Sequence, residues 1–286
     1  MVALVTPMHS DGSIDFTSLD KVVEFHVTAG TDAIIAVGTT GESATLDQEE
    51  HCAVVQHVVE KVSGRLPVIA GTGSNSTTEA IELGNCAIKS GADACLVVTP
   101  YYNKPTQLGL FEHYRVLAEK VDLPMILYNV PGRTAVDMQP ETVQKLSNIK
   151  NIVGIKEASG SLERIATLVS LCDKDFVVLS GDDDLALEAI GVGARGVISV
   201  TANVAPDCMH GVFSEALAGN MAQAKDLNSK LTGLHESLFI EANPIPVKWA
   251  LYEMGLIENG IRLPMTTLSE TYHSKLRQAM KQANLL

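Results

Sequence analysis

The chain of 286 residues has few basic residues and no long apolar run. It carries 21 lysines and arginines against 34 aspartates and glutamates, a formal net charge of −13, and this excess of acid disfavours binding to nucleic acid or to an anionic membrane. No apolar run approaches the ~20 residues of a membrane-spanning helix. The opening MVALVTP also lacks the basic segment of a signal peptide. We therefore expect neither nucleic acid nor a membrane among the partners.

Metal-binding and disulfide patterns are missing as well. The five cysteines contain no CxxC pair and no spacing typical of a disulfide framework. The eight histidines form no HxH or HExxH pair, so the sequence predicts no metal centre. Cysteines of this kind, in a chain long enough for a large core, are typical of reduced thiols. The sequence thus predicts a cytoplasmic protein.

Short apolar, β-branched runs alternate with helical patterns along most of the chain. Most of these runs are continuously apolar, which is typical of strands buried on both faces of a parallel sheet. Eight such units predict an α/β fold, a TIM (β/α)8 barrel over residues 1–220 as the catalytic domain, with a C-terminal helical extension over 221–286. An open doubly wound sheet is the less attractive alternative. The predicted strands are 2–6, 32–37, 67–71, 93–99, 124–129, 151–156, 176–180 and 196–200.

The sixth predicted strand ends on Lys156, although lysine is among the least buried residue types. In a (β/α)8 barrel the catalytic groups stand at the carboxyl ends of the strands. A free lysine has a pKa of ~10.4 and is almost fully charged at pH 7, whereas partial burial favours its neutral, nucleophilic form. Lys156 could therefore form a Schiff base with a carbonyl substrate, or it could hold a carboxylate or phosphate as a simple cation.

Two further strand ends carry groups that suit a keto acid. Tyr128 lies at the end of the fifth predicted strand, and a phenol beside an amine can move protons while a carbinolamine forms and loses water. Arg133, in the loop behind it, can hold a carboxylate by two parallel hydrogen bonds. Thr39 and Thr40 follow the second predicted strand in a glycine-flanked turn, where hydroxyl and N–H groups suit a small carboxylate. Each residue alone is typical of packing or of a turn, but together they predict a keto-acid site.

Seven motifs resemble those of the dihydrodipicolinate synthase family, a family of pyruvate-dependent class I aldolases. In chain order they are VGTTGES (37–43), TPYYNKP (99–105), YNVPGRT (128–134), GIKEASG (154–160), LSGDD (179–183), GVISVTANV (196–204) and NPIPVKWAL (243–251). The resemblance runs from Ala3 to the C-terminus. It implies a lyase that condenses pyruvate with L-aspartate 4-semialdehyde to 4-hydroxy-tetrahydrodipicolinate, the first committed step of diaminopimelate and lysine biosynthesis.

The resemblance also implies a role for each matching residue. Catalysis would fall to Lys156 as the Schiff-base lysine, Tyr128 as acid and base, and Thr39 and Tyr102 as its proton relay, with Tyr102 coming from a neighbouring subunit. Substrate binding would fall to Thr40 and the Ile198 backbone for pyruvate and to Arg133 for the carboxylate of the second substrate, with Gly181 as a further substrate-binding residue. The donated tyrosine implies an oligomer, in this family typically a homotetramer built as a dimer of dimers. No metal or organic cofactor takes part in the implied chemistry.

Some members of the family bind L-lysine as an inhibitor in a cleft at the dimer interface. The residues that match this site are Ser43, Ala44, His51, Asn75, Glu79 and Tyr101. Asn75 and Glu79 are four residues apart, which predicts that they share one helix face. The resemblance therefore implies inhibition by L-lysine, although Gln48 stands where some regulated members have a second histidine. Ordinary polar groups at an interface are the alternative.

Other pyruvate-dependent lysine aldolases, such as N-acetylneuraminate lyase or sugar-acid aldolases, are the alternative enzymes. They share the strand-end lysine and tyrosine, whereas Arg133 and the sequence PYYN suit a short amino-acid aldehyde. A non-catalytic lysine-binding or assembly protein on the same barrel is an alternative of another class. The joint presence of Lys156, Tyr128 and Thr39 disfavours it.

Overall fold

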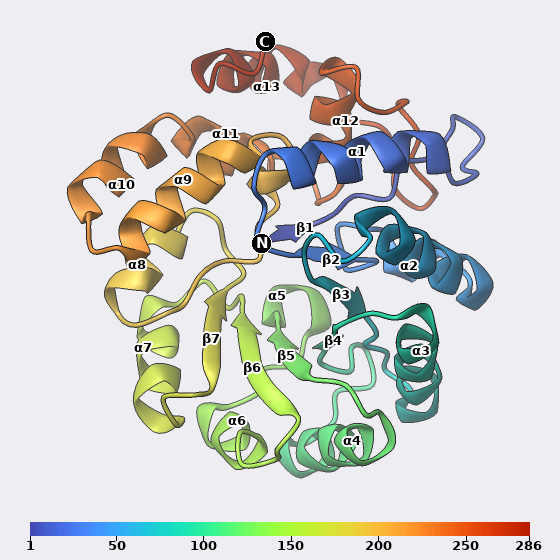
Figure 1. Ribbon diagram of the computed structural model, residues 1–286, viewed down its shortest axis with the longest axis vertical. Helices are drawn as coiled ribbons and strands as arrows, with labels where there is room; N and C mark the ends of the chain where they lie inside the picture. Colours follow the sequence, from blue (N-terminus) through green and yellow to red (C-terminus); the bar gives the residue numbers. More distant parts are fainter. The chain divides into compact units, whose positions relative to one another are not determined.

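The computed structural model describes all 286 residues and groups them into two compact units. Unit 1 comprises Met1–Val68 and Ser199–Leu286, and unit 2 comprises Ile69–Ile198. Parallel strands alternate with helices in chain order, and helices alone make up the C-terminal region (Figure 1). The fold is of the TIM-barrel type with C-terminal helices, as the sequence predicted. The domain boundary at residue 220 stays a prediction.

Unit 1 contains the first two strands and the helices at both ends of the chain. β1 (Val2–Ala3) and β2 (Ile34–Ala36) pair in parallel. Between them runs α1 (Phe16–Thr28), and α2 (Gln48–Val62) follows a short 3-10 turn, η1 (Ser43–Thr45). A capping box between Asp47 and Glu50 starts α2, because each residue satisfies a backbone N–H of the other. The remaining elements are η2 (Thr201–Asn203), α9 (Pro206–Leu217), α10 (Met221–Ser229), α11 (Thr232–Ser237), α12 (Ile245–Glu253) and α13 (Glu270–Gln282).

Unit 2 contains a parallel sheet in which each strand pairs with the next along the chain. Its strands are β3 (Val68–Gly71, of which Ile69 onward belongs to this unit), β4 (Ala94–Val98), β5 (Met125–Asn129), β6 (Ile152–Glu157) and β7 (Val177–Ser180). Figure 1 shows its longer helices along the outer side of these strands. The helices are α3 (Thr77–Ser90), α4 (Gln107–Lys120), α5 (Pro131–Thr134), α6 (Pro140–Leu146), α7 (Leu162–Leu171) and α8 (Ala186–Gly191).

The strand predicted at 196–200 is reduced to two isolated β-bridges. Within unit 2, Val197 bridges Ser180 at the end of β7, and within unit 1, Ser199 bridges Val2 of β1. The Ser199 hydroxyl accepts the N–H of Ala202 at 2.8 Å, which turns the chain into η2 directly after the second bridge. The apolar pattern of this segment therefore marks a buried segment but not a continuous strand.

Two predictions from composition have different outcomes. No helix of the structure combines the length and the apolarity needed to cross a membrane. Cys95, Cys172 and Cys208 are free thiols, whereas Cys52 and Cys86 are disulfide-bonded. The prediction that all five cysteines are reduced is therefore wrong for these two, since cysteines distant in sequence give no spacing signal.

Candidate active site

The carboxyl ends of β5 and β6 bring Lys156 and Tyr128 side by side in unit 2. The two residues are direct partners in the parallel pairing of these strands. Lys156 Nζ lies 4.3 Å from the centroid of the Tyr128 ring, a distance at which an ammonium group and an aromatic face attract. Their exposed fractions are only 5% and 7%. The structure thus joins the lysine and the tyrosine that the sequence placed at neighbouring strand ends.

Gly181, directly after β7, leaves the space that the lysine side chain occupies. A Cβ atom at this position would lie 2.8 Å from Lys156 Cε and 2.7 Å from Ala158 Cβ. Both distances are well below the ordinary separation of about 3.5–4.0 Å between carbon atoms. The Gly181 N–H also donates to the carbonyl of Glu157 at 2.8 Å, which ties this loop to the end of β6. The absence of a side chain at Gly181 therefore leaves the room that the Lys156 side chain needs.

Two carboxyl groups close to Lys156 in sequence or in space have raised pKa values. Burial raises the pKa of Glu157, although its carboxylate accepts hydrogen bonds from Asn129 Nδ2 at 3.1 Å and from the Ser159 N–H at 2.9 Å. Burial also raises the pKa of Asp182, against the opposing effects of the Gly160 N–H and of the Lys156 charge. Successive side chains of a strand point to opposite faces. The charge of Lys156 therefore acts on the Asp182 carboxyl, where it opposes the effect of burial on the pKa.

A second network fixes the end of β5 on the other side of the sheet. Asn129 Nδ2 donates to Asp137 Oδ1 at 2.9 Å as well as to Glu157. Arg164 holds Asp137 by two hydrogen bonds of 2.9 and 2.8 Å, and this guanidinium lowers the pKa of the Asp137 carboxyl. Sequence reasoning missed this network because its members are polar residues scattered over three elements. It stabilises the backbone that carries Tyr128 and Lys156.

The other predicted residues of unit 2 lie in different surroundings. Ile198 is fully buried, and its N–H already donates to the Ser180 carbonyl at 3.0 Å, so this N–H is not available to a substrate carboxylate. Arg133 is exposed in α5. Tyr102 is 88% exposed and has a φ of +73°, a strained value for a residue with a side chain. Such an exposed aromatic residue on a fixed backbone is available to another molecule.

Unit 1 holds the predicted threonine turn that follows β2. The turn is closed by backbone hydrogen bonds from the Gly41 N–H to the Gly38 carbonyl at 3.0 Å and from the Glu42 N–H to the Thr39 carbonyl at 3.1 Å. Thr39 is half-buried, whereas Thr40 is only 2% exposed. The Thr40 hydroxyl accepts a hydrogen bond of 3.0 Å from Asn243 Nδ2, a contact that the sequence did not reveal.

The residues matched to a lysine-binding site are divided between the units. Ser43, Ala44 and His51 belong to unit 1, and Asn75, Glu79 and Tyr101 belong to unit 2. α3 begins at Thr77, because the Ser76 hydroxyl caps it by accepting the Glu79 N–H. Asn75 therefore precedes the helix, and the prediction that it shares a helix face with Glu79 is wrong.

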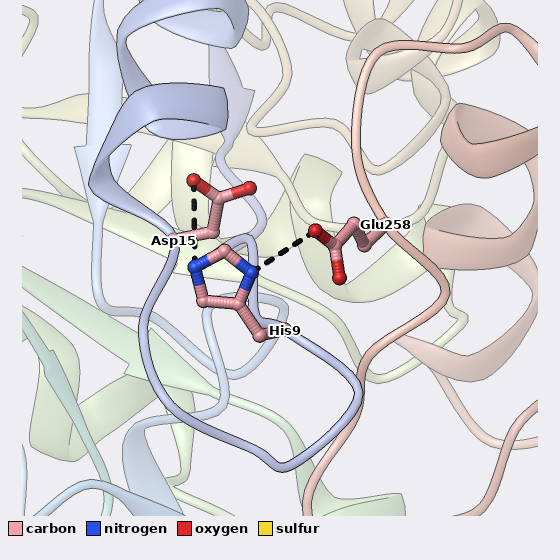
Figure 2. Close-up of side chains that lie close together, drawn as sticks. All are labelled: His9, Asp15 and Glu258. Atoms are coloured by element: carbon pink, nitrogen blue, oxygen red, sulfur yellow. Dashed lines mark hydrogen bonds and ion pairs between the residues drawn. The ribbon is translucent and has the colours of Figure 1, made fainter.

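A cluster of unit 1 outside the predicted sites joins His9, Asp15 and Glu258 (Figure 2). His9 Nδ1 lies 3.1 Å from Glu258 Oε1, and Nε2 lies 3.9 Å from Asp15 Oδ1. The hydrogen bond with Glu258 raises the pKa of His9. The three possible ligand atoms lie within 4.8 Å of one another, beside a pocket of about 400 Å³. Two features disfavour a metal ion there: the Asp15 carboxylate already caps α1, and the cation Lys21 lines the same pocket. We interpret the cluster as an ion-pair bridge between two loops.

A buried strand-end lysine against a tyrosine, in an α/β fold of the TIM-barrel type, fits an enzyme of the Schiff-base aldolase class. The model of the dihydrodipicolinate synthetase family matches residues 1–283. The 4-hydroxy-tetrahydrodipicolinate synthase of Thioalkalivibrio sulfidiphilus is 59% identical over 285 residues, 100% of this chain and 97% of that protein. The chain belongs to the dihydrodipicolinate synthetase family, and the prediction of a lyase of this family is confirmed.

Solved structures agree with this assignment. A crystal structure of the chloride-inhibited dihydrodipicolinate synthase from Acinetobacter baumannii, complexed with pyruvate, is similar with a TM-score of 0.98 and 55% identity, covering 100% of this chain and 98% of that one. The enzyme of Cyanidioschyzon merolae with lysine bound gives a TM-score of 0.97 at 42% identity, covering 100% of this chain and 97% of that one. These likenesses confirm the predicted fold class.

Proposed function

We propose that this chain condenses pyruvate with L-aspartate 4-semialdehyde through a Schiff base on Lys156. The observation that carries the proposal is the contact of Lys156 Nζ with the Tyr128 ring at 4.3 Å, at the buried end of β6. The neutral amine attacks the keto carbon of pyruvate, the carbinolamine loses water, and loss of a methyl proton gives the enamine. The enamine carbon attacks the aldehyde. The amino group of the second substrate then closes the ring on the imine carbon and displaces the lysine, giving 4-hydroxy-tetrahydrodipicolinate.

In this proposal Tyr128 moves the protons of carbinolamine formation and dehydration, with Thr39 and Tyr102 as its relay. Thr40 and the backbone of Ile198 bind pyruvate, and Gly181 is a further substrate-binding residue. Arg133 receives the carboxylate of the aldehyde substrate, for which its exposure in α5 is suitable. The proposed steps require no metal and no organic cofactor.

An oligomer follows from the same proposal. The exposure of Tyr102, 88% in the single chain, supports its donation to the site of a neighbouring subunit. We therefore expect a homotetramer, a dimer of dimers, in the cytoplasm, with residues 1–220 as the barrel domain and 221–286 as the helical region. Inhibition by L-lysine is part of the proposal and rests on the matching residues and on the lysine bound to the Cyanidioschyzon relative.

Reduction with borohydride in the presence of pyruvate tests the central step. We expect a pyruvate-derived mass increment on the peptide that contains Lys156. Lys248 is an internal control, since it is also buried, with 3% exposure, but lies in unit 1. An unmodified Lys156 peptide, or an adduct on the Lys248 peptide instead, would refute the proposal. Turnover with N-acetylmannosamine but not with the semialdehyde would favour the N-acetylneuraminate lyase alternative.

A further inference from the structure

The segment that begins α12 reaches the threonine turn at two points within unit 1. Asn243, the residue before the first proline of this segment, is 4% exposed, and its Nδ2 donates to Thr40 Oγ1 at 3.0 Å. Lys248, one helical turn further along, forms a buried ion pair with Glu42. The two contacts hold adjacent parts of one turn from one segment.

The other end of the turn is fixed as firmly. Glu42 has a φ of +58° and is 5% exposed, and its second carboxylate oxygen accepts the N–H of Arg262 at 3.1 Å. Gly41 presents its carbonyl to the Thr6 hydroxyl at 2.7 Å. A buried turn held by these hydrogen bonds cannot shift without leaving some of its polar groups unpaired, which is costly. Thr40 is thus held in one place before any ligand arrives.

The direction of the hydrogen bond from Asn243 decides what Thr40 can do. An amide NH₂ group only donates, so the Thr40 oxygen acts as the acceptor in this contact. The hydroxyl keeps its own proton for another acceptor. A carboxylate is an acceptor only, so it needs a donor of this kind, and a hydrogen bond to a charged acceptor is stronger than a neutral one.

We propose that Asn243 is a positioning residue for pyruvate: by occupying the acceptor side of the Thr40 hydroxyl, it directs the hydroxyl proton at the substrate carboxylate. The inference rests on the proposed function, which places pyruvate at Thr40. It gives a role to the motif NPIPVKWAL, whose residues the resemblance left without one. Lys248 and Arg262 contribute indirectly, because they fix the turn through Glu42.

Two variants of the full-length enzyme separate this role from a purely structural one. Asn243→Ala removes the donor, whereas Asn243→Asp puts an acceptor in its place, which captures the Thr40 proton and adds a negative charge. We expect the KM for pyruvate to rise on the order of tenfold in Asn243→Ala and further in Asn243→Asp, as for a lost hydrogen bond to a charged group. The KM for the semialdehyde should stay unchanged. Asn243→Ser, too short to reach Thr40, replaces the aspartate variant if that chain does not fold, and should behave like the alanine variant.

A double variant and a matched control complete the design. If Asn243 acts through the Thr40 hydroxyl, Asn243→Ala adds nothing to the pyruvate KM of Thr40→Val. Thr31→Val loses another buried hydrogen bond of unit 1, that of 3.0 Å between Thr31 Oγ1 and His26 Nδ1, and should keep the wild-type KM. Wild-type pyruvate KM values in the Asn243 variants, or an additive double variant, would overturn the inference. Trapping of pyruvate by the wild-type enzyme in the same experiment shows that the proposed function itself holds, whereas its absence overturns both.

Discussion

Replacement of Gly181 by alanine should impair Lys156 although the lysine itself is not substituted. The added Cβ would lie 2.8 Å from Lys156 Cε and 2.7 Å from Ala158 Cβ. Ordinary carbon contacts are about 3.5–4.0 Å, so each of the two contacts must lengthen by about 1 Å. The lysine end is flexible, but the Ala158 Cβ is attached directly to the backbone after β6. We expect a misplaced amine and a loss of about 100-fold in kcat, the effect typical of a 1 Å displacement of a reacting group.

The assay compares borohydride trapping of pyruvate, turnover and unfolding for Gly181→Ala and a control. Overpacking should also lower the free energy of unfolding by about 1–3 kcal/mol. Gly191→Ala is the control: a Cβ there meets nothing within 4 Å, and Gly191 does not have a positive φ. A folded Gly181→Ala enzyme with wild-type trapping and turnover would refute the idea that Lys156 needs the space left by this glycine.

Three further predictions concern binding and stability. Arg133→Ala should raise the KM for the semialdehyde on the order of tenfold while the KM for pyruvate stays within about twofold, as steady-state kinetics with each substrate varied would show. Lys248→Met should lower the free energy of unfolding in urea by about 3 kcal/mol, because it leaves Glu42 buried without its cation, and the added Glu42→Gln should recover part of this loss. Burial lowers the pKa of His26 from 6.5 to about 3. Below about pH 6.5, His26 therefore binds a proton in the unfolded chain but stays neutral in the folded chain. The free energy of unfolding should therefore decrease as the pH is lowered below about 6.5, by up to ~1.4 kcal/mol per pH unit. His26→Asn should flatten this slope in denaturation measured at several pH values.

The elements that the sequence predicted well are those whose signal is local. Strands buried on both faces appear in the sequence as apolar runs. The observed ends of β5 and β6 lie within one residue of the predicted ends. Because both are parallel strands, their carboxyl ends meet at one edge, and the pairing of Tyr128 with Lys156 followed from that rule. The segment 196–200 has the same apolar signal but only two bridges, since pairing also depends on where the chain turns next.

The features that the sequence did not reveal depend on contacts between distant residues. Asn243 and Thr40 are 203 residues apart, and no spacing rule connects an amide before a proline with a hydroxyl in a turn. The same holds for Lys248 and Glu42, at 206 residues. Lys248 stood out as a lysine in an apolar stretch, but its partner could be found only from the folded chain.

These contacts give the C-terminal region a structural role at the threonine turn. A barrel domain that ends at residue 220 would contain Thr39 and Thr40 but would lack Asn243, Lys248 and Arg262, whose contacts fix the turn. The Glu42 carboxylate would then lose both the ammonium of Lys248 and the N–H of Arg262, and with them the contacts that hold this end of the turn. We therefore expect the segment after residue 220 to be needed for pyruvate binding at Thr40. The turn and its anchors also lie in the same compact unit, which comprises residues 1–68 and 199–286.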